Sequence, residues 1–287
     1  MTARHFATLA LVLASAFATP SHGAQPAWSN DVGATFAAAR ASGRSILVDL
    51  YADWCGWCKT LEARVFSTPE FTAYASRFEL LRVDVEDGGD GSELAERYGS
   101  NSLPTLLVLE PTGALVGAVV GYHEAPAFLA QIRNAFASHQ RFLAGYASAL
   151  VATDPDAVRA AAGELHRRAD GGRAATLYAR LIELLSPTGD ELAWLRFYRA
   201  DALRLARRFD DARREAEVAA RAGAGTRDLF LAERLELLPF WIARDAERCG
   251  DALEVLASFQ ERHPRSAFLP GARSALERLR GGGASCS

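Results

Sequence analysis

The sequence changes its pattern near residue 140, and this change constrains the fold more than any other feature. Before it, short β-branched apolar runs alternate with segments of helical periodicity. After it, nearly every segment has helical periodicity, with breaks at Gly, Pro and Ser. Alternating strands and helices predict a sheet with helices on its faces, whereas helices joined by short turns predict antiparallel pairs. We therefore predict an α/β domain over residues 25–140 and an all-α domain over residues 141–281.

The first domain is predicted to hold a central mixed sheet flanked by helices. Apolar runs predict strands at 45–51, 78–85, 105–109 and 114–121. Capping and stop residues predict helices at 30–41, 55–66, 69–74, 92–98 and 125–138, with Ser29 or Asn30 capping the first and Ser92 the fourth. Strand–helix–strand order implies parallel pairing, and the turn at Pro111-Thr112-Gly113 adds an antiparallel hairpin.

The two ends of the chain stand apart from the domains. Residues 1–24 have the layout of a secretory signal peptide, with Arg4 and His5 before an apolar run at 6–18 and small residues after it. No other segment reaches the roughly 18 apolar residues of a membrane span, so no membrane contact is expected after cleavage. We expect an exported, periplasmic protein. The tail at 282–287, within the run GGGASCS, is predicted to be disordered.

Charge and cysteine content exclude several classes of protein. A net charge of -3 gives no reason to expect a nucleic-acid partner. Four cysteines are too few for disulfides to stabilise a chain of 287 residues, so its stability must come from a core of packed apolar side chains. Cys249 and Cys286 could form a structural disulfide or have no joint role, and the sequence leaves both readings open. No second C-x-x-C pair completes a zinc site, so no metal is expected.

The stretch ILVDLYADWCGWCK at 46–59 joins a buried strand, a short loop and a C-x-x-C that opens a helix. Free N–H groups and the dipole at a helix N-terminus are expected to lower the pKa of Cys55 and favour its thiolate. Cys58 lies one helical turn further on, where it can attack a mixed disulfide formed at Cys55. The pair predicts dithiol–disulfide exchange with a protein partner. The electrons reside on the two sulfurs, so no organic cofactor is needed.

The segment 31–136 resembles the thioredoxins, and among them the periplasmic interchange type found in the C-terminal domain of DsbD. The matching pieces are VDLYADWCGWCK at 48–59, VFSTPEF at 65–71, VDVED at 83–87, SLPTLLVL at 102–109 and Gly121. The resemblance implies a thioredoxin fold with Cys55 as nucleophile and Cys58 as resolving thiol. It also implies that Asp49 assists proton transfer at Cys58 and that Pro104 is a cis-proline facing the disulfide.

Physical arguments support the role of Asp49. A carboxylate inside the apolar run Val48-Asp49-Leu50 is costly unless it is paired, protonated or used, and burial should raise its pKa. The alternative is an aspartate that points off a strand edge. For Pro104 the alternative is an ordinary trans turn, because the dipeptide Leu103-Pro104 alone does not specify a cis bond.

Four further residues are expected to face the substrate: Trp54, Gly56, Trp57 and Leu103. Trp54 has a second interpretation, core packing, which is the default for such an aromatic side chain. Thioredoxins have proline where this chain has Trp57, which gives a bulkier and more apolar rim. No histidine lies between the cysteines to destabilise the disulfide, so reduction or interchange is favoured over oxidation.

The second domain resembles degenerate tetratricopeptide repeats, on the pieces ALRLARRFDDAR at 202–213 and ALEVLASFQERHPRSAFLPGARSALERL at 252–279. Such arrays present a concave surface to a protein or peptide. A plain helical bundle packed on the redox domain is the alternative. Two functions remain open: an exported thiol–disulfide oxidoreductase, and a periplasmic adaptor or chaperone in which the helical array is the working part.

Overall fold

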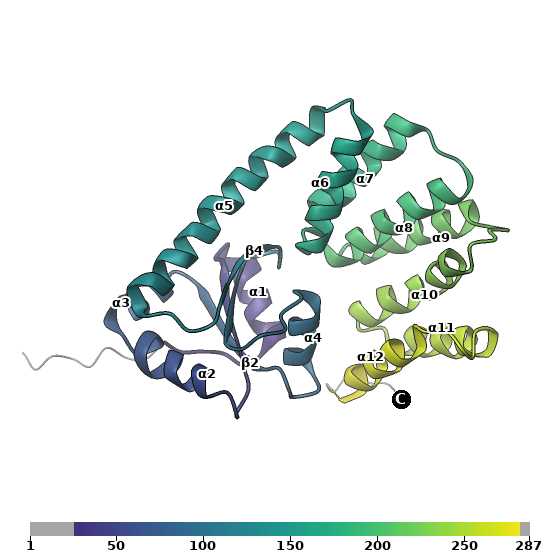
Figure 1. Ribbon diagram of the computed structural model, residues 1–287. Helices are drawn as coiled ribbons and strands as arrows, with labels where there is room; N and C mark the ends of the chain where they lie inside the picture. Colours follow the sequence, from purple (N-terminus) through teal and green to yellow (C-terminus); the bar gives the residue numbers. More distant parts are fainter. Residues whose placement is uncertain (1–25, 282–287) are drawn as a thin grey trace, which may run out of the picture.

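The computed structural model describes residues 26–281. A four-stranded mixed sheet with helices on both faces is followed by an all-α region (Figure 1). This order confirms the predicted fold class. The signal peptide predicted for residues 1–24 and the tail predicted for 282–287 lie outside the described residues.

The sheet has the strand order β2-β1-β3-β4, which places β1 (Ile46–Tyr51) and β3 (Thr105–Leu109) in its centre. β1 is parallel to β2 (Glu79–Asp84) and antiparallel to β3, and β3 is antiparallel to β4 (Leu115–Val120). Leu50 pairs with Thr105, so β3 begins beside the point where β1 ends. The loop after β1 and the loop before β3 therefore meet at one edge of the sheet.

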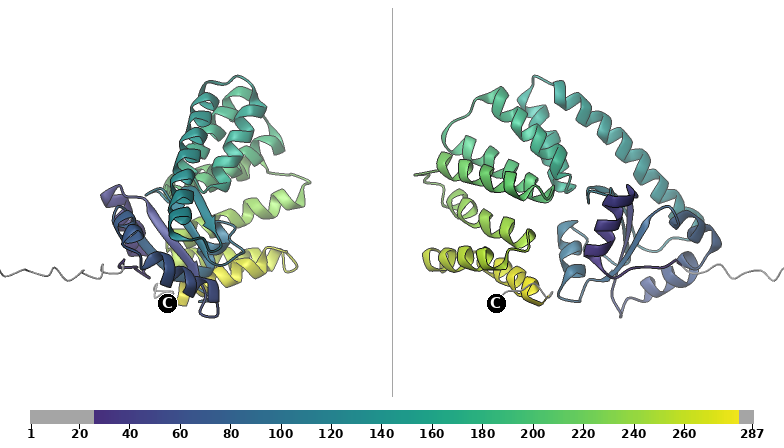
Figure 2. Two further views of the ribbon diagram at one scale, coloured as in Figure 1. Left: turned by 60° about the vertical axis from the view of Figure 1, so that its left-hand side comes forward. Right: turned by 180° about the vertical axis from the view of Figure 1, so that it is seen from behind.

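Helices cover both faces of this sheet (Figure 2). They are α1 (Val32–Ser42), α2 (Gly56–Leu61), the π-helical turn η1 (Glu62–Phe66), α3 (Pro69–Ala75), α4 (Asp90–Arg97) and α5 (Ala125–Val151). Val48 and Leu50 point to the face covered by α1 and α4, and Leu47 points to the face covered by α2, α3 and α5. Because side chains alternate along a strand, Asp49 shares the face of Leu47 and points toward α2.

Two helix starts differ from the sequence prediction. The cap of α1 is Asp31, whose carboxylate accepts the N–H of Ala34 at 2.8 Å, while Ser29 is hydrogen-bonded to the backbone of β2. α4 begins at Asp90, ahead of the predicted cap Ser92. The Asp87 carboxylate accepts N–H groups at this helix start, so a side chain outside the helix performs the expected capping.

The helix predicted at 125–138 continues without interruption to Val151, as α5. The predicted domain boundary between residues 140 and 141 therefore falls inside one helix. The chain has no proline between Pro126 and Pro155, so nothing ends the helix before the Asp154-Pro155 pair opens the next one. Phe142 and Tyr146 of α5 pack on the helical region, whereas Phe128 and Ile132 belong to the core of the sheet domain.

The all-α region contains seven helices in the described residues. They are α6 (Pro155–Arg167), α7 (Gly171–Leu185), α8 (Gly189–Leu205), α9 (Phe209–Ala222), α10 (Leu229–Asp245), α11 (Cys249–Arg262) and α12 (Leu269–Gly281). Each packs on its neighbour in the chain, and two apolar cores run through the array. Gly171 lets α7 approach α8 closely, because a Cβ there would lie 2.1 Å from the carbonyl oxygen of Ala202.

Three turns of this array have the same geometry. Ala169, Arg207 and Glu247, which lie 38 and 40 residues apart, follow α6, α8 and α10 and all have φ values of 54–58°. In each turn the next N–H donates to a carbonyl five residues earlier: Asp170 to Leu165, Arg208 to Leu203, and Arg248 to Ala243. The pairs α6–α7, α8–α9 and α10–α11 are therefore related helix–turn–helix units, as a repeat array requires.

The two sequence pieces that carry the tetratricopeptide resemblance do not occupy equivalent positions in these units. Residues 202–213 span the turn between α8 and α9, whereas residues 252–279 lie across α11 and α12. The shared turn instead relates 202–213 to 242–253. Alanines recur on both helices of a pair, so residue composition alone does not determine which helices are equivalent.

The array contacts the sheet domain at two places. Near the β3–β4 hairpin, the N–H of Leu115 donates to the carbonyl of Arg168 at 2.7 Å, and Glu110 accepts hydrogen bonds from both Arg173 and His139. At α4, Glu93 forms a 2.9 Å ion pair with Arg244 of α10. Figures 1 and 2 show α5 leading away from the sheet and the later helices returning to α4.

A fragment from Arg141 onward is expected to be helical and to melt cooperatively, because it keeps the part of α5 that packs on the array. A fragment from Ala152 onward loses Phe142 and Tyr146 and should melt about 10 °C lower, since partly buried aromatics contribute roughly 1.5 kcal/mol each or more. Circular dichroism melts of both fragments test this. A non-cooperative melt of the longer fragment beside a normal melt of the full chain would show one fused domain.

Candidate functional site

The two cysteines of the C-x-x-C form a disulfide at the start of α2. Cys55 is the N-cap of this helix, and the backbone N–H of Cys58 donates to its Sγ at 3.1 Å. The same N–H stabilises negative charge on Cys55 once the disulfide is opened. The geometry therefore favours the Cys55 sulfur, rather than Cys58, as the thiolate of the reduced pair.

An exposed aromatic rim surrounds this disulfide. Cys55 and Cys58 are only 4% and 3% exposed, whereas the adjacent Trp54 and Trp57 are 68% and 62% exposed. The core-packing default for Trp54 is therefore wrong, because the short loop after β1 holds its side chain outside the core. Trp57 stacks on Tyr122, which follows β4, at 5.5 Å between ring centroids. Exposed aromatic side chains grouped in this way are typical of sites that bind another protein.

Leu103 and Pro104 reach the same edge of the sheet from the other side. Their peptide bond is cis, the isomer that the family resemblance implies. The carbonyl of Pro104 accepts the N–H of Gly121 at 2.8 Å, so the start of β3 is tied to the end of β4. The Leu103 side chain packs against the core on the α1 and α4 face, which leaves its backbone rather than its side chain at the edge.

Asp49 lies in the central strand and is 2% exposed, so it does not point off a strand edge. Burial raises the pKa of Asp49 from its ordinary 3.8 to about 7, while the positive charge of Arg82 opposes that rise. The Nε of Arg82 lies 3.3 Å from Oδ2 of Asp49, and Oδ1 has no hydrogen-bond partner among the described residues. A carboxyl group with this pKa can accept and return a proton near neutral pH.

Glu62 is a member of this site that the sequence reading did not identify. It opens η1 directly behind α2, and its Oε2 lies 2.9 Å from Nη2 of Arg82. Arg82 thus bridges Glu62 and Asp49, and its guanidinium lies 4.4 Å from the ring centroid of Tyr51. The sequence spacing could have indicated this residue, because Glu62 follows Cys58 by four residues and residues four apart lie on the same side of a helix. Tyr122 was missed as well, because only the fold brings it beside Trp57.

Other chemistry-bearing residues do not join this site. Cys249 is buried in α11 and is not a free thiol, and Cys286 lies outside the described residues. Within residues 26–281, no group of three or more His, Cys, Asp or Glu side chains is placed to hold a metal ion. No helix of that same range is long and apolar enough to cross a membrane.

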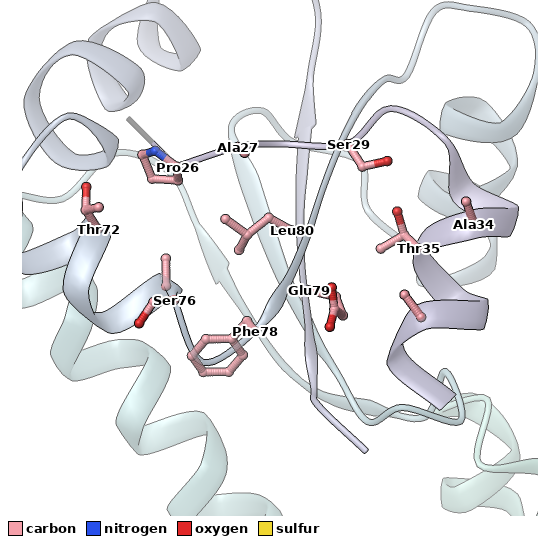
Figure 3. Close-up of a pocket in the computed structure, with 12 residues that line it drawn as sticks. Pro26, Ala27, Ser29, Ala34, Thr35, Thr72, Ser76, Phe78, Glu79 and Leu80 are labelled. Carbon is pink, nitrogen blue, oxygen red and sulfur yellow. The ribbon is translucent and has the colours of Figure 1, made fainter. Parts of the chain in front are cut away.

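A shallow hollow of about 440 Å³ lies between the N-terminal segment, α1 and α3 (Figure 3). Its lining is mostly small and apolar, with Thr35, Phe78 and Leu80 among its residues. The carboxylate of Glu79 is already paired with Arg44 at 3.3 Å. This hollow holds no arrangement of reactive groups, so the disulfide edge is the candidate active site.

Comparison with known proteins agrees with this geometry. Residues 27–111 match the family model described as Thioredoxin-like. The chain is 43% identical over 77 residues to the thiol:disulfide interchange protein DsbD of Pseudomonas fluorescens, which covers 26% of this chain and 13% of that protein. It is 36% identical over 101 residues to DsbD of Cronobacter sakazakii, which covers 34% and 18%.

Solved structures similar to the chain include the oxidised C-terminal domain of Neisseria meningitidis DsbD, with 25% identity and a TM-score of 0.33. That match covers 38% of this chain and 98% of the domain. The chain spans less than a fifth of the length of the curated relatives that it matches. Residues 27–111 thus match the Thioredoxin-like family model and are similar in sequence to a part of DsbD, and an all-α region follows them.

Proposed function

We propose that this protein is an exported thiol–disulfide oxidoreductase that acts on protein partners through Cys55 and Cys58. One observation carries the proposal: a disulfide caps a helix at an exposed edge of the sheet, above a buried carboxyl group with a pKa of about 7. The relationship to interchange proteins named DsbD supports the same reaction. The signal-like sequence at 1–24 supports export.

The proposed reaction begins with the reduced protein. The Cys55 thiolate attacks one sulfur of a partner disulfide, which forms a mixed disulfide and releases the partner's other sulfur as a thiolate. Asp49 then takes the proton of Cys58, and the new thiolate attacks Sγ of Cys55. The second partner thiolate leaves, so the partner gains two electrons and the Cys55–Cys58 disulfide is regenerated. No group beyond the two thiols carries electrons.

Reduction or interchange is the proposed direction. Gly56 and Trp57 separate the cysteines, and neither places a positive charge beside the disulfide. The rim formed by Trp54, Trp57 and Tyr122 would receive an apolar stretch of the partner. The measurement that tests the proposal is the rate at which the full chain, kept reduced by dithiothreitol, reduces the disulfides of insulin. A rate no faster than that of dithiothreitol alone would refute it.

Alkylation should distinguish the two thiols. In the reduced protein at mildly acidic pH, iodoacetamide is expected to modify Cys55 first, because its sulfur receives the N–H of Cys58 and Cys58 lies inside α2. Peptide mapping by mass spectrometry reads out the modified residue. Modification of Cys58 before Cys55 would overturn the assignment of nucleophile and resolving thiol.

A second candidate function is an adaptor or chaperone whose working part is the helical array. The observation that favours it is the repeated turn geometry of α6–α11, which builds an extended surface. Cys55→Ser distinguishes the two functions. If the protein is an oxidoreductase, the variant loses its disulfide reductase activity, and if it is an adaptor, the variant still binds its partner protein.

A further inference from the structure

A groove of about 1000 Å³ lies between α4 and the side of the helical array that faces it. Residues of α4, α6, α8, α10 and α12 line the groove, and none comes from the disulfide edge. Its charged lining is dominated by arginine: Arg97, Arg167, Arg204, Arg234, Arg244 and Arg278, against Glu93, Glu96 and Asp201. The groove is therefore a site of net positive charge in a chain whose net charge is -3.

Four of these arginines are neutralised by carboxylates of the chain itself. The pairs are Arg97 with Glu93 at 3.0 Å, Arg167 with Glu164 at 2.6 Å, Arg204 with Asp201 at 2.7 Å, and Arg244 with Glu93 at 2.9 Å. Arg204 and Arg244 occupy equivalent places in the repeated turns, and both also pair with Asp245. These four side chains build the wall of the groove and have little charge left to offer a ligand.

Arg234 of α10 is different, because it has no ion pair with any described residue. Its guanidinium lies among aromatic rings, 4.8 Å from the ring centroid of Phe197, 5.3 Å from that of Phe230 and 5.8 Å from that of Phe268. Its Nε is buried and has no hydrogen-bond partner. The rings hold the side chain in place and shield it from water, so its attraction for an incoming carboxylate is strengthened.

Among the arginines that line the groove, Arg278 of α12 is the second without an ion pair to a described residue. Its Nε is also buried without a hydrogen-bond partner. α10 and α12 pack against one another, so the two free guanidinium groups belong to adjacent helices on one wall. On the α4 wall, Glu96 is exposed and has no ion pair among the described residues, so one free carboxylate faces two free guanidinium groups.

We propose that this groove binds an extended acidic segment of a partner protein. Its carboxylates would contact Arg234 and Arg278, and its apolar side chains would pack on Trp241 and Phe268. Charge complementarity favours this partner, because a guanidinium binds a carboxylate with two parallel hydrogen bonds. Arginine set among aromatic rings is typical of the residues that dominate protein–protein binding energy. The inference does not depend on chemistry at Cys55.

Fluorescence anisotropy of the full chain with a fluorescein-labelled dodecapeptide that alternates Glu and Leu tests the inference. Saturable binding that weakens with salt is expected, with no binding of the matched peptide that has Lys in place of Glu. Arg234→Gln and Arg278→Gln should each weaken binding about tenfold, since a hydrogen bond to a charged group contributes about 1.5 kcal/mol or more. Arg227→Gln is the matched control, because Arg227 is exposed and lies outside the groove; it should leave the affinity within about twofold.

If Arg234→Gln does not fold, Arg234→Lys replaces it in the test. The lysine keeps the positive charge but cannot form two parallel hydrogen bonds to a carboxylate, so it should weaken peptide binding less than the glutamine variant would. Equal binding of the Lys peptide, or equal loss in Arg227→Gln, would overturn the proposal. Saturation by inorganic phosphate or oligodeoxythymidylate without binding of the acidic peptide would overturn it as well, in favour of a phosphate ligand. The Cys55→Ser protein should bind the peptide with the affinity of the wild type. The binding result therefore tests the groove independently of whether the redox proposal holds.

Discussion

Replacing Cys55 by serine is expected to abolish insulin reduction, with a loss of at least about a thousandfold, because Cys58, the thiol that remains, lies inside α2 and lacks the N-cap position that favours the thiolate of Cys55. Cys58→Ser should also stop turnover, but at a later step. In that variant, reduced beforehand and then freed of dithiothreitol, Cys55 still attacks the partner disulfide, and Cys58 is no longer there to resolve the adduct. A covalent complex between the Cys58→Ser protein and insulin should therefore accumulate.

Non-reducing electrophoresis and mass spectrometry of the adduct make this measurement. The adduct should appear with Cys58→Ser and be absent with Cys55→Ser. Thermal melts of both variants and of the reduced wild type supply the control for folding. Retention of more than about a tenth of the turnover by a folded Cys55→Ser protein would show that exchange occurs elsewhere in the chain.

Asp49→Ala is expected to slow the resolving step. The pKa of Asp49 is about 7, so the carboxylate is available as a base above that pH and is lost below it. In the wild type, decay of the mixed disulfide should rise with a midpoint near pH 7. In the variant the rise should shift toward the ordinary thiol pKa of about 8.5, with decay slower by about tenfold or more near pH 6. Stopped-flow fluorescence follows the decay, and identical pH profiles would refute the role of Asp49.

Removing the Asp49 carboxylate should slow turnover but increase the free energy of unfolding near neutral pH. The pKa of Asp49 is raised on folding from 3.8 to about 7, so the folded state binds this proton more tightly than the unfolded state does. Its contribution to stability is complete below about pH 4 and is lost as the pH rises through 7, by on the order of 4 kcal/mol at most. Arg82 keeps Glu62 as a partner when Asp49 is removed.

Asp49→Asn, which keeps the shape of the side chain without its charge, should therefore be more stable than the wild type at about pH 8, with an advantage that disappears near pH 4. Asp49→Ala should show the same trend, reduced by the cavity it leaves. Urea unfolding at the two pH values measures both. A wild type more stable than the asparagine variant at about pH 8 would show that the ionised carboxylate is well paired.

Local patterns predicted the part of the site that is contiguous in sequence. The apolar run around Asp49 and the C-x-x-C placed the strand, the disulfide and the start of α2 correctly. The bridge from Asp49 through Arg82 to Glu62 was not visible, because it joins two strands and a helix. Tyr122 likewise reaches Trp57 only through the pairing of β3 and β4.

Boundaries proved harder to predict than element types. A pattern change near residue 140 marks where α5 exchanges one packing partner for another, and nothing in helix propensity requires a break there. The groove arginines were equally hidden. Arg204 and Arg234 look alike in the sequence, and only the fold shows that the first has carboxylate partners while the second lies among aromatic rings.

The length of α5 has a mechanical consequence for the whole chain. Its 27 residues make a rigid strut of about 40 Å that anchors one end of the array to the sheet. The Glu93–Arg244 ion pair ties the array back to α4 near its other end. Helical solenoids with free ends stretch and bend like springs, because each unit contacts only its neighbours. In this chain the helical array is attached to the sheet domain near both of its ends, which restricts its bending. A ligand that widens the groove must therefore first break the ion pair between Glu93 and Arg244.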